Sequence, residues 1–212
     1  MALTATDLAM KGKRLWQQLK ADKAGAAAAE FAMLILPMTT VMLGTYDIAY
    51  QFYLRSVVQG ALNDVARTAS LEAPTLNCTG TTLVEQIQCA VKKRSSVVAR
   101  DATFTVTVKN FYDFSTVGRS EKLVTDYNNN GVYDVGDCFV DLNENRAFDA
   151  SAGRSGVGGG DDVAFYDVTV TMPRVFPVAD FMPISRNYSI RAQTALRNQP
   201  YTRQRIPPTV CV

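Results

Sequence analysis

The segment that decides the fold runs from Gly25 to Ser70 and reads GAAAAEFAMLILPMTTVMLGTYDIAYQFYLRSVVQGALNDVARTAS. Between Ala24 and Tyr46 its only charged residue is Glu30. As a helix that rises about 1.5 Å per residue, residues 24–46 would extend roughly 35 Å, enough to cross a hydrocarbon core of about 30 Å. The segment therefore predicts a transmembrane helix, with a buried core helix and a cleaved secretory signal as the alternatives.

The residues before this helix predict its orientation. The first 25 residues carry more basic than acidic side chains, and basic flanks of membrane helices stay in the cytoplasm. We therefore expect a cytoplasmic leader (1–25), a long helix (26–70) and an extracytoplasmic domain (71–212). The basic residues of the leader are Lys11, Lys13, Arg14, Lys20 and Lys23.

The helix is predicted to continue beyond the membrane, because apolar residues after Tyr53 recur every three or four positions and form one helical stripe. This second half should pack on a soluble domain and end before Pro74, since the residue preceding a proline avoids helical angles. Pro37, in the apolar half, is expected to bend the helix. The stripe is Leu54, Val58, Leu62, Val65 and Ala69, and the opposite face holds Ser56, Gly60, Asn63, Asp64 and Arg67.

Glu30 is the informative charge in the apolar half. A carboxylate at that depth costs about 2–3 kcal/mol on insertion scales unless a cation pairs with it. Either Glu30 lies at the headgroup level, or another subunit supplies the cation. The motif Gly25-Ala26-Ala27-Ala28-Ala29-Glu30-Phe31, after a basic leader and before an apolar helix, resembles the prepilin-peptidase site of tight-adherence pilus systems. The whole stretch from Gly25 to Ser70 is similar to TadE-like pseudopilins.

This resemblance implies a processed assembly subunit. In that family the leader is cut after the glycine, which here would release Ala26 as the new N-terminus. Glu30, followed by Phe31, would then face the new α-amine of its own or a neighbouring chain. The implied partners are a prepilin peptidase, other pilin or pseudopilin subunits and inner-membrane lipid. The implied location is the bacterial inner membrane, crossed once, with the C-terminal domain in the periplasm or carried into a surface pilus.

Residues 71–212 predict a small α+β domain. Thr82-Leu83-Val84-Glu85 fits a capping box that starts a short helix, and Lys92-Lys93-Arg94 suits its end. Three later segments alternate apolar and polar residues with a period of two, which indicates an antiparallel sheet with one wet face. The long helix would cover the other face, giving a pilin-like α+β fold. The alternating segments are 103–108, 166–172 and 188–197.

An acidic insert, residues 113–162, carries the clearest chemical signal. Residues 126–137 place oxygen-bearing side chains at loop positions 1, 3, 5, 9 and 12 and glycine at position 6. This is the pattern of calcium loops of EF-hand and dockerin type, in which position 7 contributes its backbone carbonyl. A solvated, turn-rich loop is the alternative. The predicted calcium ligands are Asp126, Asn128, Asn130, Val132, Asp134 and Asp137.

A second copy of the loop pattern follows. It keeps positions 1, 3, 5 and 9, but Arg146 replaces the glycine and Ala152 stands at position 12. An ion there needs an additional ligand, for which Asp161 and Asp162 are candidates, and a plain polar loop is an equal alternative. Without flanking helices, we expect calcium-bound loops inserted between strands. The ligands of the second copy are Asp141, Asn143, Asn145 and Asp149.

The four cysteines are expected to form disulfides if this domain lies outside the cytoplasm. We predict the pairs Cys78–Cys89 and Cys138–Cys211, the second of which would tie the C-terminal tail to the first calcium loop. Zinc is the alternative, but no CxxC spacing supports it.

Composition restricts the possible functions. The chain has no histidine, which excludes Ser-His-Asp and Cys-His catalysis, and its net charge of +2 gives no case for a nucleic-acid partner. A hydrolase with paired carboxylates stays open. Since calcium loops explain the same carboxylates, we expect no enzyme and no catalytic residue. A minor pseudopilin and a permanently anchored calcium-dependent adhesin are the remaining hypotheses.

Overall fold

A computed structural model describes residues 25–212, so the predicted leader, apart from Gly25, lies outside the described residues. Ile48–Val212 form one compact unit, and the residues up to Asp47 form another. The helices are α2 (Ala26–Ala69) and α3 (Leu83–Ser95), and two short 3-10 turns are η1 (Phe114–Thr116) and η2 (Pro177–Asp180). The strands are β1 (Thr103–Phe111), β2 (Leu123–Thr125), β3 (Cys138–Val140), β4 (Arg154–Ser155), β5 (Val163–Pro173), β6 (Asn187–Arg197) and β7 (Thr209–Cys211).

Helix α2 is 44 residues long and continues through Pro37. In its first half the hydroxyl groups of Thr39 and Thr40 donate hydrogen bonds to the carbonyl oxygens of Ile35 and Leu36, at 2.8 and 2.5 Å. These bonds satisfy the polar hydroxyls within the helix itself, which an apolar environment requires.

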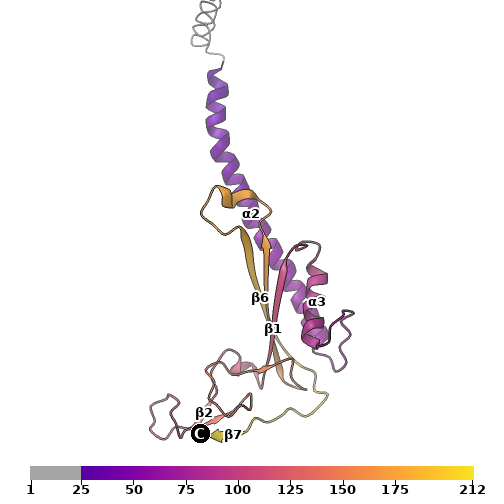
Figure 1. Ribbon diagram of the computed structural model, residues 1–212, viewed down its shortest axis with the longest axis vertical. Coiled ribbons are helices and arrows are strands. Elements are labelled where there is room, and N and C mark those ends of the chain that lie inside the picture. The colour runs from indigo at the N-terminus through magenta and orange to yellow at the C-terminus, as the bar shows by residue number, and fades with distance from the viewer. Residues whose placement is uncertain (1–24) are drawn as a thin grey trace, which may run out of the picture. The chain divides into compact units, whose positions relative to one another are not determined.

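The second half of α2 supplies one side of the core. Leu54, Val58, Leu62 and Val65 are all 0% exposed, so the predicted apolar stripe is confirmed. They join one cluster with buried residues of α3 and of the larger sheet. Figure 1 shows this half of α2 running beside the sheet that contains β1 and β6.

The larger sheet has four antiparallel strands in the order β4-β1-β5-β6. Along β5, buried residues alternate with half-buried ones, and Val168 is paired with Val106 on one side and Ala192 on the other. All three predicted strands are present, and the α+β class is confirmed. Strand β4 has two residues, too few for an alternating pattern to reveal it.

Helix α3 starts where the sequence predicts. The backbone N–H of Glu85 donates to the Thr82 hydroxyl at 3.2 Å, and the Thr82 N–H donates to the Glu85 carboxylate at 3.3 Å. This reciprocal pair is a complete capping box. The Cys78–Cys89 disulfide joins the preceding loop to the helix.

A second, small sheet with the order β2-β3-β7 was not predicted. Cys138 and Cys211 are directly opposed in the β3–β7 pair and are joined by a disulfide, with their Cα atoms 4.1 Å apart. Both predicted disulfides are therefore present. Figure 1 shows β2, β7 and the C-terminus lying beyond one end of the larger sheet. Each of the two calcium-loop motifs follows a strand of this small sheet.

Candidate functional site

The predicted processing site lies at the start of α2. The carbonyl of Gly25 accepts the first hydrogen bond of the helix, from the Ala29 N–H at 3.0 Å. Glu30 and Phe31 are exposed, and among the described residues the Glu30 carboxylate makes no hydrogen bond or ion pair. The residues that follow the predicted cleavage point are thus accessible, and the Glu30 carboxylate is available to a partner outside this chain.

Large apolar side chains in the first half of α2 point outward. Phe31, Leu34 and Leu36 are 64%, 69% and 71% exposed. Among the described residues, α2 is the one helix long and apolar enough to cross a membrane, judged by length and composition. Burial in lipid or against other helices would remove this apolar surface from water.

The first calcium-loop motif, residues 126–137, is named the first loop. Its side-chain oxygens organise its own backbone: the Gly131 N–H donates to Asp126 Oδ2 at 2.7 Å, and the Val132 N–H donates to Asn130 Oδ1 at 2.7 Å. The side-chain amides of Asn128 and Asn130 both donate to Asp134 Oδ2, at 2.7 and 2.8 Å. The side chains of positions 3, 5 and 9 therefore converge, and the position-1 carboxylate holds the turn at position 6.

Asp137, at position 12, closes the first loop. It is 2% exposed and accepts hydrogen bonds from the backbone N–H groups of position 2 (Tyr127, 3.0 Å) and position 9 (Asp134, 2.9 Å). Across the loop, Asp126 Oδ1 is buried and receives no hydrogen bond. A buried carboxylate oxygen without a donor is costly, and a bound cation would satisfy it.

The second loop, residues 141–152, repeats these hydrogen bonds with one difference: Asp141 Oδ1 accepts from the Asn145 N–H at 3.2 Å, whereas Asp126 Oδ1 accepts none. The N–H of position 6 donates to the position-1 carboxylate, here Arg146 to Asp141 at 2.8 Å. The N–H groups of positions 5 and 7 donate to the side chains of positions 3 and 5, at 3.0 and 2.7 Å. The amides of Asn143 and Asn145 both donate to Asp149 Oδ2, at 2.5 and 2.8 Å. The side chains of positions 3, 5 and 9 of the second loop therefore converge as in the first, and Asp141 holds the turn at positions 5 and 6.

The backbones of the two loops also agree. Position 4 has a positive φ in both, 56° at Asn129 and 61° at Glu144. Position 6 does too, 76° at Gly131 and 62° at Arg146. The second loop thus adopts the left-handed turn without glycine, at the conformational cost such a residue carries. The missing glycine therefore does not prevent the second loop from adopting the same turn as the first at positions 4 and 6.

The position-12 role in the second loop is taken by Glu121, a residue that sequence reasoning missed. Its Oε1 accepts from the Leu142 N–H (position 2) at 2.8 Å and its Oε2 from the Asp149 N–H (position 9) at 3.0 Å. Asp162, one of the two carboxylates expected to supply an additional ligand to the second loop, instead accepts hydrogen bonds from Gly159 and Gln204. Glu121 precedes the loop by 20 residues, so no local spacing reveals it.

Aromatic residues join the two loops. Tyr133 and Phe148, each at position 8 of its loop, stack with ring centroids 4.5 Å apart and an interplanar angle of 5°. Phe139 of β3 meets both rings edge-on, at 5.5 and 5.6 Å. Together with the Cys138–Cys211 disulfide, this cluster fixes the loops as a pair rather than as two independent turns.

Electrostatics differ between the two loops. Hydrogen bonds from Asn128 and Asn130 lower the pKa of Asp134. Burial raises the pKa of Glu121, and the negative charges of Asp141 and Asp149 raise it further. Over residues 25–212, no three His, Cys, Asp or Glu side chains are arranged so that they alone could hold a metal. Any ion would therefore depend on the asparagine oxygens and backbone carbonyls as well, as calcium loops do.

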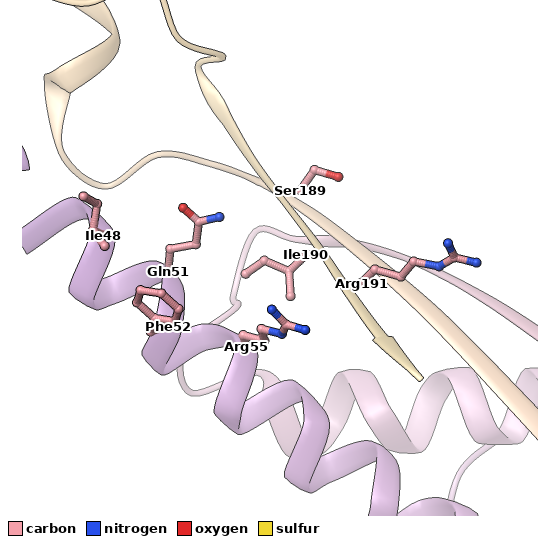
Figure 2. A pocket seen from close by; sticks show the side chains of 7 residues that line it. All are labelled: Ile48, Gln51, Phe52, Arg55, Ser189, Ile190 and Arg191. Carbon is pink, nitrogen blue, oxygen red and sulfur yellow. The ribbon is translucent and has the colours of Figure 1, made fainter. Parts of the chain in front are cut away.

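A groove of about 290 Å³ lies between α2 and β6, both parts of it within the unit Ile48–Val212. Figure 2 shows Ile190 pointing toward α2, whereas the side chains of Ser189 and Arg191 point away from it. Its charged residues are Arg55 and Arg191, and its lining has no carboxylate or cysteine. This groove therefore offers no acid–base pair for catalysis.

The comparisons with known proteins bear on α2. The family model described as TadE-like protein matches residues 25–67, which begin at the predicted processing site and end near the C-terminus of α2. The similarity inferred from Gly25–Ser70 is thereby confirmed for this segment. No curated protein and no solved structure matches the chain.

Proposed function

We propose that this chain is a minor pseudopilin of TadE-like type, a structural subunit of a tight-adherence pilus or a related secretion apparatus. It is held in the bacterial inner membrane by the first half of α2, with residues 71–212 in the periplasm. It binds prepilin peptidase as a substrate and pilin subunits as assembly partners, and it has no enzymatic activity of its own.

The observation that carries this proposal is the contrast between the two halves of α2, of which one exposes its apolar side chains and the other buries them. Phe31, Leu34 and Leu36 expose apolar side chains in one half, whereas Leu54 and Leu62 are fully buried in the other. One continuous helix therefore links a lipid-compatible segment to the core of a folded domain. The TadE-like match covers both halves.

Glu30 has a defined task in this proposal. Cleavage between Gly25 and Ala26 creates a positive α-amine four residues before Glu30 in the chain. Pairing with this amine, or with that of a neighbouring subunit, offsets the cost of placing a carboxylate in an apolar helix. Glu30 makes no competing ion pair among the described residues.

Calcium is the proposed ligand of the paired loops. The donor set is all oxygen, the buried Asp126 Oδ1 receives no hydrogen bond, and Asp137 is 2% exposed. Hard cations with six to eight oxygen ligands match such a set. Asp126, Asn128, Asn130, Asp134 and Asp137, with the Val132 carbonyl, would hold the ion and stiffen the acidic insert.

A permanently anchored calcium-dependent adhesin is the second candidate, favoured by the same loops. It differs in one respect, because it requires no processing at Gly25. The two candidates are separated by an epitope tag at the C-terminus and an immunoblot of cells with and without their prepilin peptidase. The pseudopilin loses residues 1–25 only when the peptidase is present.

Gly25→Leu is the informative variant in that experiment, since a side chain at the scissile bond should block cleavage. Gly44→Leu is the matched control, because an added Cβ meets nothing within 4 Å at either position. We expect full-length Gly25→Leu and normally processed Gly44→Leu in peptidase-positive cells. A wild-type chain of identical length with and without the peptidase would exclude processing and favour the adhesin.

A further inference from the structure

Two carboxylates in the insert perform the same task from opposite directions along the chain. Asp137 lies at the end of the first loop and contacts the N–H groups of positions 2 and 9 with its two oxygens. Glu121 lies before the second loop and contacts the N–H groups of positions 2 and 9 there, again with one oxygen each. The four distances lie between 2.8 and 3.0 Å.

The placement of Glu121 is fixed by backbone hydrogen bonds on either side of it. Its own N–H donates to the Asp149 carbonyl at 3.0 Å, and the carbonyl of Arg119 accepts from the Ala152 N–H at 3.3 Å. The carbonyl of Lys122 accepts from the Val140 N–H at 2.9 Å, which aligns this segment with β3. Backbone hydrogen bonds therefore join the segment 119–122 to the second loop and to β3. These bonds fix the position of Glu121 independently of the contacts of its carboxylate.

Burial makes a cation at this position favourable. Glu121 is 2% exposed and Asp141 is 1% exposed, so the carboxylate that contacts the second loop and the position-1 carboxylate of that loop are both almost entirely removed from water. Arg154 and Arg205 form their ion pairs with Glu144, not with Glu121 or Asp141. Buried carboxylates without a paired charge are costly, and a divalent cation reverses the sign of that contribution.

The second loop shares most of the hydrogen bonds of the first. The asparagines at 3 and 5 and the aspartate at 9 have the same hydrogen-bond partners, and positions 4 and 6 have a positive φ in both loops. Position 1 differs, since Asp141 Oδ1 accepts an additional bond from the Asn145 N–H at 3.2 Å. In the first loop, Asp126 Oδ1 is buried without a hydrogen-bond donor, which identifies the side of the loop that a cation would occupy. The second loop keeps the ligand types at positions 1, 3, 5 and 9 but has Ala152 at position 12, so a site there needs one carboxylate from elsewhere.

We propose that Glu121 is the missing position-12 ligand of the second loop, so that the insert binds two calcium ions rather than one. This inference rests on the proposed calcium function and deepens it. It assigns a role to a residue outside both motifs, and it converts the incomplete second loop into a full site. It also links the segment before β2 to the second loop through the ion itself.

The test is calcium titration by isothermal calorimetry of the full-length, disulfide-intact protein in detergent, after removal of bound metal with a chelator. Calcium chloride alone is the probe. We expect two ions per chain for the wild type. Glu121→Gln keeps the size of the side chain but removes its charge, and should bind one ion, with affinity at the second site weakened by at least about tenfold. Glu72→Gln, an exposed glutamate outside the insert, is the matched control and should still bind two.

A further variant separates this inference from the calcium function on which it rests. Asp137→Asn should lose the ion of the first loop while Glu121→Gln loses that of the second, and far-UV circular dichroism in chelator checks that both fold. A wild type that binds no calcium would overturn the calcium proposal itself. If the wild type binds calcium and Glu121→Gln binds the same number of ions with the same affinity, the role of Glu121 alone is overturned.

Discussion

Leu62 lies at the centre of the buried stripe of α2, and its truncation to alanine tests whether this half of the helix is core. Leu62 is 0% exposed and belongs to the main hydrophobic cluster. The change removes three carbon atoms, a transfer loss of roughly 2.4 kcal/mol at about 0.8 kcal/mol each. An incompletely relaxed cavity raises the loss to about 3–4 kcal/mol. This is a large share of the roughly 5–15 kcal/mol that stabilises an ordinary domain.

The assay is urea unfolding of the full-length protein in mild detergent with both disulfides intact, monitored by far-UV circular dichroism. With a denaturant slope of about 2 kcal/mol per molar urea, the midpoint should fall by roughly 1.5–2 M. Ser56→Ala, on the exposed face of the same helix, is the control and should change stability by less than about 0.5 kcal/mol. Equal midpoints for the two variants would refute the packing of this stripe against the sheet.

Two further changes probe the surface of the larger sheet and the small sheet. A hydrogen bond from Arg191 lowers the pKa of Asp167, so the pair adds stability above the ordinary aspartate pKa of 3.8 and loses it as the pH falls through the lowered value. Because Arg191 is largely exposed, Asp167→Asn should lower the free energy of unfolding by at most about 1 kcal/mol at pH 7. It should also flatten the acid limb of a curve of stability against pH, and an unchanged acid limb would contradict the pairing. Replacing both Cys138 and Cys211 by alanine opens a link across 73 residues and should lower the free energy of unfolding by about 4 kcal/mol, measured by urea unfolding, and no loss would contradict this estimate.

The elements that could be predicted from the sequence are those with a repeating pattern. The stripe from Leu54 to Ala69 has helical spacing and is buried as expected. The alternation along β1, β5 and β6 has the period of a strand, and their pairing is antiparallel as a half-polar sheet requires. The capping box at Thr82 is a local motif, so its partners are already adjacent in sequence.

The elements that could not be predicted are short or depend on distant residues. Strands β2, β3 and β7 have three residues each, and their pairing is set by contacts far apart in the chain. The same is true of the second loop. Its own residues indicate positions 1, 3, 5 and 9, but the carboxylate that contacts positions 2 and 9 comes from Glu121, which only the fold brings there. The sequence favours Asp161 and Asp162, which follow the loop, whereas the observed carboxylate, Glu121, precedes it.

As a proposed assembly subunit, the chain should pack the exposed apolar side chains in the first half of α2 against pilins. The most direct measurement is photo-crosslinking in cells that carry the complete pilus system, with a photoreactive amino acid in place of Leu34, which is 69% exposed on α2. Val97, 89% exposed in the outer domain, is the control position. The account predicts covalent adducts between the Leu34-substituted chain and a pilin subunit, stronger than at Val97. Adducts with lipid alone at position 34 would contradict it.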